Sequence, residues 1–155
     1  MSKKTLDALE QTIEMLSKEH DEVDSMFDDY KKLMDYEAAA TTRKTLATKI
    51  CDALTQHAEL EEQIFYPAAR EYLKKDNEEI MDHADVEHAT LKGLIERIST
   101  SKASDPHFDA LVHVLGEYVK HHVEEEEDEM FSELRKEGAD MKAALKAMKA
   151  FKAGQ

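Results

Sequence analysis

Apolar side chains in the first 34 residues recur at alternating spacings of three and four, and this pattern constrains the fold more than any other feature of the chain. The series is Leu6, Leu9, Ile13, Leu16, His20, Val23, Phe27, Tyr30 and Met34. Such spacing places the side chains on one face of a long α-helix, which must pack that face against other helices. One member of the series, His20, is not apolar.

Three further segments show the same helical period, and each carries polar residues on its inward face. A second helix is expected to begin at Thr41 or Thr42, a third to cover about 78–99 and a fourth to cover about 108–136. Their inward residues are, in chain order, Leu46, Ile50, Leu54, His57, Glu61, Ile64 and Ala68; Ile80, Ala84, His88, Leu91, Ile95 and Ile98; and Phe108, Leu111, Leu115, Val119, His122, Glu126 and Met130.

Prolines and polar runs predict where these helices end. Pro67 is expected to kink or end the second helix, although Ala68, Ala69, Tyr72 and Leu73 could carry another turn beyond it. Residues 74–77 are expected to connect this segment to the third helix. Residues 99–106 read as a loop, with Asp105 as the cap of the fourth helix and Pro106 in its first turn.

The composition favours long helices and a folded core. Only four glycines and two prolines occur among 155 residues, and hydrophobic residues reach 41% although 36% of the residues are charged. We therefore expect an all-α fold in a single domain over residues 1–155. It is an antiparallel four-helix bundle over about 5–136, followed by a short fifth helix over about 139–152.

The charge of the chain disfavours two classes of partner. A formal net charge of −14 repels the phosphates of nucleic acids and of anionic membranes. No apolar run approaches the roughly 18 residues that a membrane helix needs. The one cysteine, Cys51, cannot form a disulfide within the chain, and we expect a cytoplasmic protein. The sequence indicates no particular protein partner.

The two halves of the chain repeat one pattern, in which Glu-His on one helix is followed by His-x-x-x-Glu on the next. These residues are Glu19, His20, His57 and Glu61 in the first half, and Glu87, His88, His122 and Glu126 in the second. Residues four apart lie one turn apart on the same helical face, so each His-x-x-x-Glu pair can reach a single point in the core.

Four inward histidines and two inward carboxylates together predict a metal centre. The candidate ligands are His20, His57, Glu61, His88, His122 and Glu126. One histidine on a core face is usually a structural residue, but burying six such groups without partners would cost several kcal/mol or more. Imidazole and carboxylate without thiolate suit iron, manganese or zinc. Two ions fit the count better than one, because Glu61 and Glu126 can each bridge a pair, and the set leaves a position open for a small molecule.

The remaining histidines are weaker candidates. Three fall outside the inward faces and are expected at the surface: His107, His113 and His121. On the third helix, His83 lies five residues before His88, about 140° round the helix, whereas Asp85 lies three residues before it and has the better phase. Either could be a seventh ligand, and Glu87 is a further, weaker candidate.

Four segments carry these candidates: EHDEV at 19–23, HAELEEQIFYP at 57–67, VEHATLK at 86–92 and HHVEEE at 121–126. Together and in this order they resemble the hemerythrin-like, HHE cation-binding family over about residues 5–136. The resemblance implies an antiparallel four-helix bundle that holds two non-haem iron ions joined by an oxo or hydroxo bridge. In that arrangement His20 and His57 bind one iron, His88 and His122 bind the other, and Glu61 and Glu126 span both.

The chain departs from the oxygen-carrying members of that family at one position. Those members have five histidine ligands, two of them four residues apart on the third helix, whereas position 84, four before His88, is alanine here. One iron therefore lacks a histidine. Water could complete its coordination, or Asp85 or His83 could do so if a π-bulge between 83 and 88 distorts the helix, or nothing completes it.

The expected function is binding of dioxygen, nitric oxide or peroxide at an open iron position, as in oxygen or nitric oxide binding or sensing. One alternative is a di-iron enzyme that handles peroxide or oxidises ferrous iron. Another is an iron-responsive sensor that acts through a protein partner, with the basic last helix as the expected partner surface. We expect a metal- and gas-binding protein rather than an enzyme, and the sequence offers no catalytic residues.

Overall fold

The computed structural model describes residues 2–73 and 77–155, and every regular element within those residues is helical. The elements are α1 (Lys3–Asp35), α2 (Ala40–Leu60), the π-helical turn η1 (Glu61–Phe65), α3 (Tyr66–Arg70), α4 (Glu78–Thr100), α5 (Phe108–Glu125), the π-helical turn η3 (Glu126–Met130), α6 (Phe131–Lys136) and α7 (Lys142–Ala153). The all-α prediction is therefore confirmed over this part of the chain. Residues 74–76 of the expected connection lie outside the described residues.

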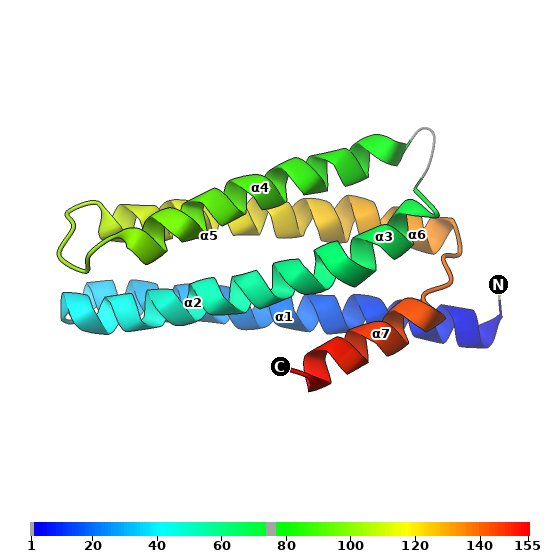
Figure 1. The fold of residues 1–155 in the computed structure, drawn as a ribbon, viewed down its shortest axis with the longest axis horizontal. Helices are drawn as coiled ribbons and strands as arrows, with labels where there is room; N and C mark the ends of the chain where they lie inside the picture. Colours follow the sequence, from blue (N-terminus) through cyan, green and yellow to red (C-terminus); the bar gives the residue numbers. More distant parts are fainter. Residues whose placement is uncertain (1, 74–76) are drawn as a thin grey trace.

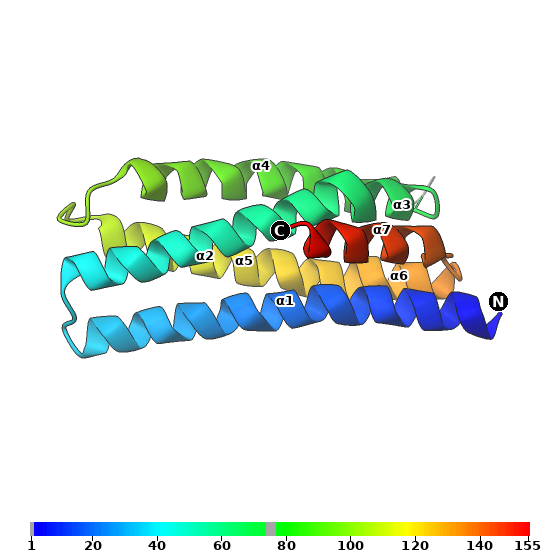
Figure 2. The same cartoon turned by 60° about the horizontal axis from the view of Figure 1, so that its bottom comes forward.

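The long helices lie side by side, as in a helical bundle (Figures 1 and 2). The chain reverses direction between α1 and α2 and again between α4 and α5, so that each pair forms a hairpin. Contacts between α2 and α4 and between α1 and α5 join the two hairpins. Helix α7 packs on α1 and η1. No helix in the described part of the chain is long and apolar enough to cross a membrane.

Two helix starts differ in detail from the sequence prediction. Helix α2 begins at Ala40, and neither Thr41 nor Thr42 caps it with its side chain. Helix α5 begins at Phe108, so Pro106 precedes the helix. Asp105 does accept a backbone hydrogen bond, from the amide of His107 at 2.8 Å, and this bond closes a turn just before the helix.

Both helical hairpins contain a π turn, in which backbone hydrogen bonds span five residues instead of four. The amide of Tyr66 donates to the carbonyl of Glu61, and the amide of Phe131 donates to the carbonyl of Glu126. Pro67 does not end the helical segment, because the chain continues as α3 to Arg70, as the apolar residues after Pro67 allow. The regular helix α2 instead gives way to η1 at Glu61, before Pro67. Proline is not the general cause of a π turn here, since Ser132 stands at the equivalent position after η3. The two turns instead share a buried glutamate as their first residue.

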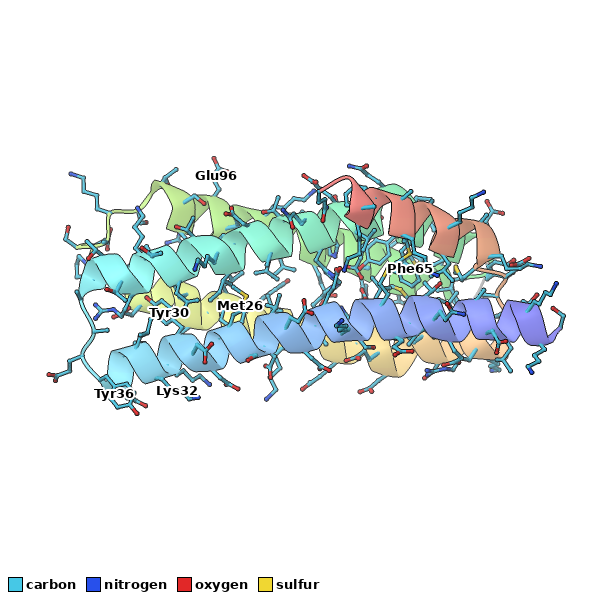
Figure 3. All side chains as sticks on the ribbon, turned by 90° about the horizontal axis from the view of Figure 1, so that it is seen from below. Met26, Tyr30, Lys32, Tyr36, Phe65 and Glu96 are labelled. Carbon is cyan, nitrogen blue, oxygen red and sulfur yellow. The ribbon has the colours of Figure 1, made fainter. Side chains whose placement is uncertain are left out.

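Two clusters of buried apolar residues flank a polar layer in the middle of the molecule. One cluster includes Leu16, Phe65 and Phe131, and the other includes Val23 and Leu115. Phe65 is fully buried and lies between α1 and α7 in the view of Figure 3. Each inward histidine falls at the boundary between the clusters, so the apolar residues on both sides hold the polar layer in place.

Candidate metal centre

The six residues predicted as ligands converge on this polar layer from different elements. His20 comes from α1, His57 from α2, His88 from α4 and His122 from α5, while Glu61 and Glu126 open the two π turns. All are buried except His57, which is half-buried. Their donor atoms form two groups that could each hold a metal ion: one of His20, His57, Glu61 and Glu126, and one of Glu61, His88 and His122.

The first group is compact. Nε2 of His57 lies 3.2 Å from Nε2 of His20 and 3.2 Å from Oε1 of Glu61. Nε2 of His20 lies 3.3 Å from Oε1 of Glu126. Donor atoms at these separations can share one ion, because ligands at about 2.1 Å from a metal and at right angles to each other are about 3 Å apart.

The second group has the same character. Nε2 of His88 lies 3.2 Å from Nε2 of His122 and 3.1 Å from Oε1 of Glu61. Nε2 of His122 lies 3.4 Å from Oε2 of Glu126. Each carboxylate therefore approaches one histidine of each pair: Glu61 meets His57 and His88, and Glu126 meets His20 and His122. That is the placement a carboxylate needs to span two ions.

Buried carboxylate oxygens at this site fit a bound cation. Among the described residues, Oε2 of Glu61 and Oε1 of Glu126 are buried and accept no hydrogen bond. A buried carboxylate oxygen that accepts no hydrogen bond is costly, because it has lost its hydration. A metal cation coordinated by these oxygens and by the Nε2 atoms would offset that loss, so the residues present fit a metal centre.

A second layer of carboxylates orients the histidines from outside. Nδ1 of His57 lies 2.7 Å from Glu19. The corresponding distances are 3.2 Å from His88 to Glu62 and 2.9 Å from His122 to Glu87. His20 differs, because its Nδ1 makes no hydrogen bond and Glu127, 3.9 Å away, accepts from Ser17 instead. A carboxylate on the outer ring nitrogen fixes the orientation of the imidazole and directs Nε2 inward, as at many metal sites.

Sequence reasoning missed this outer layer, although the repeat contained the signal. The repeat contains Glu19 and Glu87, but helical spacing assigns no role to Glu19 and makes Glu87 only a weak candidate metal ligand. In the structure both cross to the neighbouring helix of their own hairpin and bind its histidine. Glu62 and Glu127 directly follow the two central glutamates, and each lies within 4 Å of the outer nitrogen of a histidine on the other hairpin. The repeated unit is therefore Glu-His followed by His-x-x-x-Glu-Glu.

The carboxylates change the protonation of two histidines. Burial by itself would lower the pKa of His57, but the charge of Glu61 and the hydrogen bond to Glu19 outweigh it and raise the pKa to about 10. For His122 burial is likewise outweighed, by hydrogen bonds to Glu126, Glu61 and Glu87, and its pKa rises to about 12. Burial would raise the pKa of Glu61, yet His57 and its hydrogen-bond partners hold it well below its usual value. His57 and His122 therefore form buried ion pairs with Glu61 and Glu126.

Tyr66 is a further residue at the centre that the sequence did not single out. Its buried hydroxyl donates to Oε2 of Glu126 at 2.7 Å and lies 3.3 Å from Oε1 of Glu61. It is also 3.1 Å from Nε2 of His88 and 3.3 Å from Nε2 of His122. Burial, with the charges of Glu126 and Glu61, raises the pKa of Tyr66 well above its usual value, so the metal-free hydroxyl is protonated.

The π turn explains why α-helical spacing does not point to Tyr66. In an α-helix, a residue five positions after Glu61 points about 140° away from it. In η1 the wider turn brings Tyr66, five positions after Glu61, back above that glutamate, as the hydrogen bond from the amide of Tyr66 to the carbonyl of Glu61 shows. A site residue at this spacing becomes visible only once the π turn is known.

The structure does not bring the possible seventh ligands His83 and Asp85 to the centre. His83 is exposed, with Nε2 3.5 Å from Glu79, and Asp85 is exposed and bonded to Arg70. Helix α4 is α-helical throughout 78–100, so the π-bulge considered between 83 and 88 is absent there. The three histidines expected at the surface are exposed: His107, His113 and His121.

An apolar cavity of about 280 Å³ adjoins the centre on the side of the second apolar cluster. Side chains of Val23, Leu54, Leu91, Ile95 and Val119 line it, together with the four histidines. The cavity leaves room for a small molecule beside the four histidines, and the exposed residues Glu59, Lys92 and Glu96 also border it.

Comparison with known proteins identifies the family of the chain. Residues 11–134 match the family described as the hemerythrin HHE cation binding domain. The chain belongs to this family, and the resemblance drawn from its motifs is confirmed. It is therefore a cation-binding domain, and its His and Glu clusters are able to hold metal.

Two curated relatives match over part of their length. A DNA nickase of Nostoc sp. (strain PCC 7120) is 37% identical over 83 residues, which are 53% of this chain and 22% of that protein. An uncharacterized hemerythrin-like protein of Schizosaccharomyces pombe is 26% identical over 110 residues, 71% of this chain and 52% of that protein. The chain thus spans about a fifth and about half of these relatives. No solved structure gives a significant match.

Proposed function

We propose that this chain is a non-haem di-iron protein, folded as an antiparallel four-helix bundle, that binds dioxygen or a related small molecule such as nitric oxide. The observation that carries the proposal is the placement of Glu61 and Glu126. Each carboxylate contacts both histidine pairs, and each keeps one buried oxygen without a hydrogen bond. A single ion would bind one histidine pair and leave the other pair without a metal, so two ions fit the site better than one.

Each group of residues would have a defined task. His20 and His57 would hold one iron and His88 and His122 the other, with Glu61 and Glu126 across both. Iron at these positions supplies an exchangeable coordination position and electrons for a diatomic ligand. Glu19, Glu62 and Glu87 keep the imidazoles in one orientation, so that the ligands need not rearrange when the small molecule arrives.

The cavity beside the centre favours a small apolar ligand. Its lining includes the aliphatic side chains of Leu91 and Val119 together with the four histidines. Dioxygen and nitric oxide enter apolar cavities readily, whereas a hydrated ion loses its water shell without compensation.

The name of the Nostoc relative suggests a different activity, which we do not extend to this chain. The match covers 22% of that protein, and a net charge of −14 disfavours binding to DNA phosphates. Peroxide turnover, ferrous iron oxidation and iron sensing remain the outcomes against which gas binding is tested.

Stopped-flow spectroscopy of the reduced, iron-loaded protein separates these functions. Mixing with dioxygen should give a stable oxygenated species that reverts when dioxygen is removed. Rapid oxidation with repeated turnover of peroxide or ferrous iron would instead identify an enzyme. No reaction with the gas, combined with unfolding on metal removal, would favour the iron sensor.

Two variants on the same helix provide the control for that experiment. His88→Ala should lose one iron and the oxygen-dependent spectrum, because His88 lies at the centre. His83→Ala should keep both irons and the spectrum, because His83 is exposed and binds Glu79 instead. Equal loss in both variants would contradict the assigned centre.

A further inference from the structure

The two halves of the metal centre are alike except at one pair of positions. Tyr66 lies five residues after Glu61, and Phe131 lies five residues after Glu126. In each case the amide of the aromatic residue closes the π turn on the carbonyl of the glutamate. The repeat therefore places the two aromatic rings in equivalent positions, one against each histidine pair.

The rings make different contacts because only one carries an oxygen. The ring of Phe131 stacks over His20, with centroids 6.5 Å apart and planes 8° apart, and it offers no donor atom to the centre. The ring of Tyr66 lies 5.0 Å from that of His88, and its hydroxyl reaches into the second group of ligands. The phenol thus distinguishes the two metal positions.

The hydroxyl of Tyr66 stands where a ligand atom would stand. Its distances to His88, His122 and Glu61 are 3.1, 3.3 and 3.3 Å. The donor atoms of the candidate ligands lie at similar distances from one another: 3.1 Å from His88 to Glu61, 3.2 Å from His88 to His122 and 3.4 Å from His122 to Glu126. Neighbouring ligands of one ion are expected about 3 Å apart. The oxygen is buried, so no water competes for its place.

We propose that Tyr66 is a seventh protein ligand, binding the iron held by His88 and His122 through its phenolate oxygen. This inference rests on the proposed di-iron function. Tyr66 would supply the protein ligand that Ala84 cannot, and it would do so from the first position of α3, directly after η1, rather than from α4. The iron held by His20 and His57 has Phe131 in the equivalent place and gains no such ligand.

Binding of the Tyr66 oxygen to iron requires no oxidant. An oxygen–iron bond forms, the phenolic O–H bond breaks, and the proton is released to solvent, as for any protein ligand that must deprotonate to bind metal. In the metal-free protein that proton is donated to Glu126, so metal binding also removes this hydrogen bond. An anionic oxygen favours the ferric state, so the two irons should differ in reduction potential and in access to a small ligand.

Visible absorption and resonance Raman spectra of the iron(III)-loaded protein test the proposal, together with metal analysis. A phenolate bound to iron(III) gives a charge-transfer band in the visible region and enhanced phenolate ring vibrations. Both should be present in the natural protein and absent from Tyr66→Phe. Tyr30→Phe is the matched control, because Tyr30 is also buried and donates to a carboxylate, Asp109, at 2.6 Å, but at a distance from the centre. It should leave both signals unchanged.

A second measurement needs no variant and covers the case in which Tyr66→Phe fails to fold. Ring-deuterated tyrosine incorporated into the natural protein should shift the enhanced vibrations. Two irons per chain without a tyrosine signal, or with a signal that survives in Tyr66→Phe, would overturn the ligand role and leave the di-iron function standing. One iron with a tyrosine signal would support the ligand role and overturn the two-ion centre. A chain that binds no iron would overturn both.

Discussion

At the scale of single residues, the account depends on carboxylates that never touch the metal positions. Glu19, Glu62 and Glu87 each contact the outer nitrogen of a histidine on another helix. Lys152 of α7 bonds to Glu19, and Lys92 bonds to Glu62, so two of the three are held in turn by lysines. The orientation of the ligands is thus set by side chains at the edge of the core.

Glu87→Gln should weaken metal binding while leaving the fold intact. The amide keeps the size of the side chain but loses the charge that favours His122 as a donor, and such changes cost about 10- to 100-fold in metal affinity. Competition with a chelator measures the effect. Glu96→Gln serves as control, because Glu96 lies on the same helix and points into solvent (Figure 3). Equal affinity of Glu87→Gln and the natural protein would rule out this role.

The stability of the metal-free protein should fall as the pH rises above about 6.5. His57 and His122 have folded pKa values raised to about 10 and about 12 from 6.5, so their stabilising effect is complete below pH 6.5 and is lost toward those higher values. Glu61 has a lowered pKa, so its effect is present above about 4.5 and is lost in acid. Melting temperatures across this range check the sign, and His122→Gln should flatten the decline. A melting temperature that rises between pH 6.5 and 9 would contradict the ion pairs.

At the scale of elements, the two π turns decide which residues meet. Each begins at a central glutamate and brings the residue five positions later, Tyr66 or Phe131, back above that glutamate. A π turn is equivalent to one residue inserted into an α-helix, and such turns are frequent at functional sites. The helices before and after each turn therefore keep their inward faces.

Deleting Gln63 should be tolerated for this reason. Gln63 is exposed in η1, and without it the turn can close as an α-helix with Tyr66 still above Glu61. Thermal unfolding should show a loss of less than about 1.5 kcal/mol, a modest effect for a single change. Deleting Glu96, exposed in the regular helix α4, should cost far more, because it rotates Ile98 out of the core by about 100°. Similar losses in both deletions would show that η1 is not an insertion.

The sequence predicts the parts of this molecule that follow the α-helical period. The inward faces that contain His20 and His88 repeat this period over many turns, so the helices and the convergence of the six candidate ligands can be predicted from spacing. The position of Tyr66 cannot be predicted in this way, because its spacing from Glu61 has the wrong phase for an α-helix. The role of Glu19 cannot be predicted either, because Glu19 lies beside the inward face and reaches His57 only after two helices have packed.

At the scale of the whole molecule, the polar layer divides one core into two apolar clusters. Helix α7 contributes Ala144 and Met148 to the first cluster, and its Lys152 bonds to Glu19 beside His57. The apolar clusters can hold the helices together by themselves, but the charges between them need a counterion or protons. Metal binding and folding should therefore be linked.

Removing metal should lower the melting temperature without abolishing the helical fold. A ligand that binds only the folded state stabilises it by about 2.7 kcal/mol when its concentration is 100 times its dissociation constant. Circular dichroism of metal-loaded and chelated protein at the same pH measures the difference. Equal midpoints would mean that the ions contribute nothing to the stability of the packed helices.

The central claim is that Glu61 and Glu126 join two metal positions, and a metal count tests it most directly. Protein purified without added metal, then loaded with ferrous iron and freed of excess, should hold two irons per chain by elemental analysis. His20→Ala and His122→Ala, one from each group of ligands, should each reduce the count toward one. A saturated natural protein with a single iron, unchanged by His122→Ala, would contradict the account.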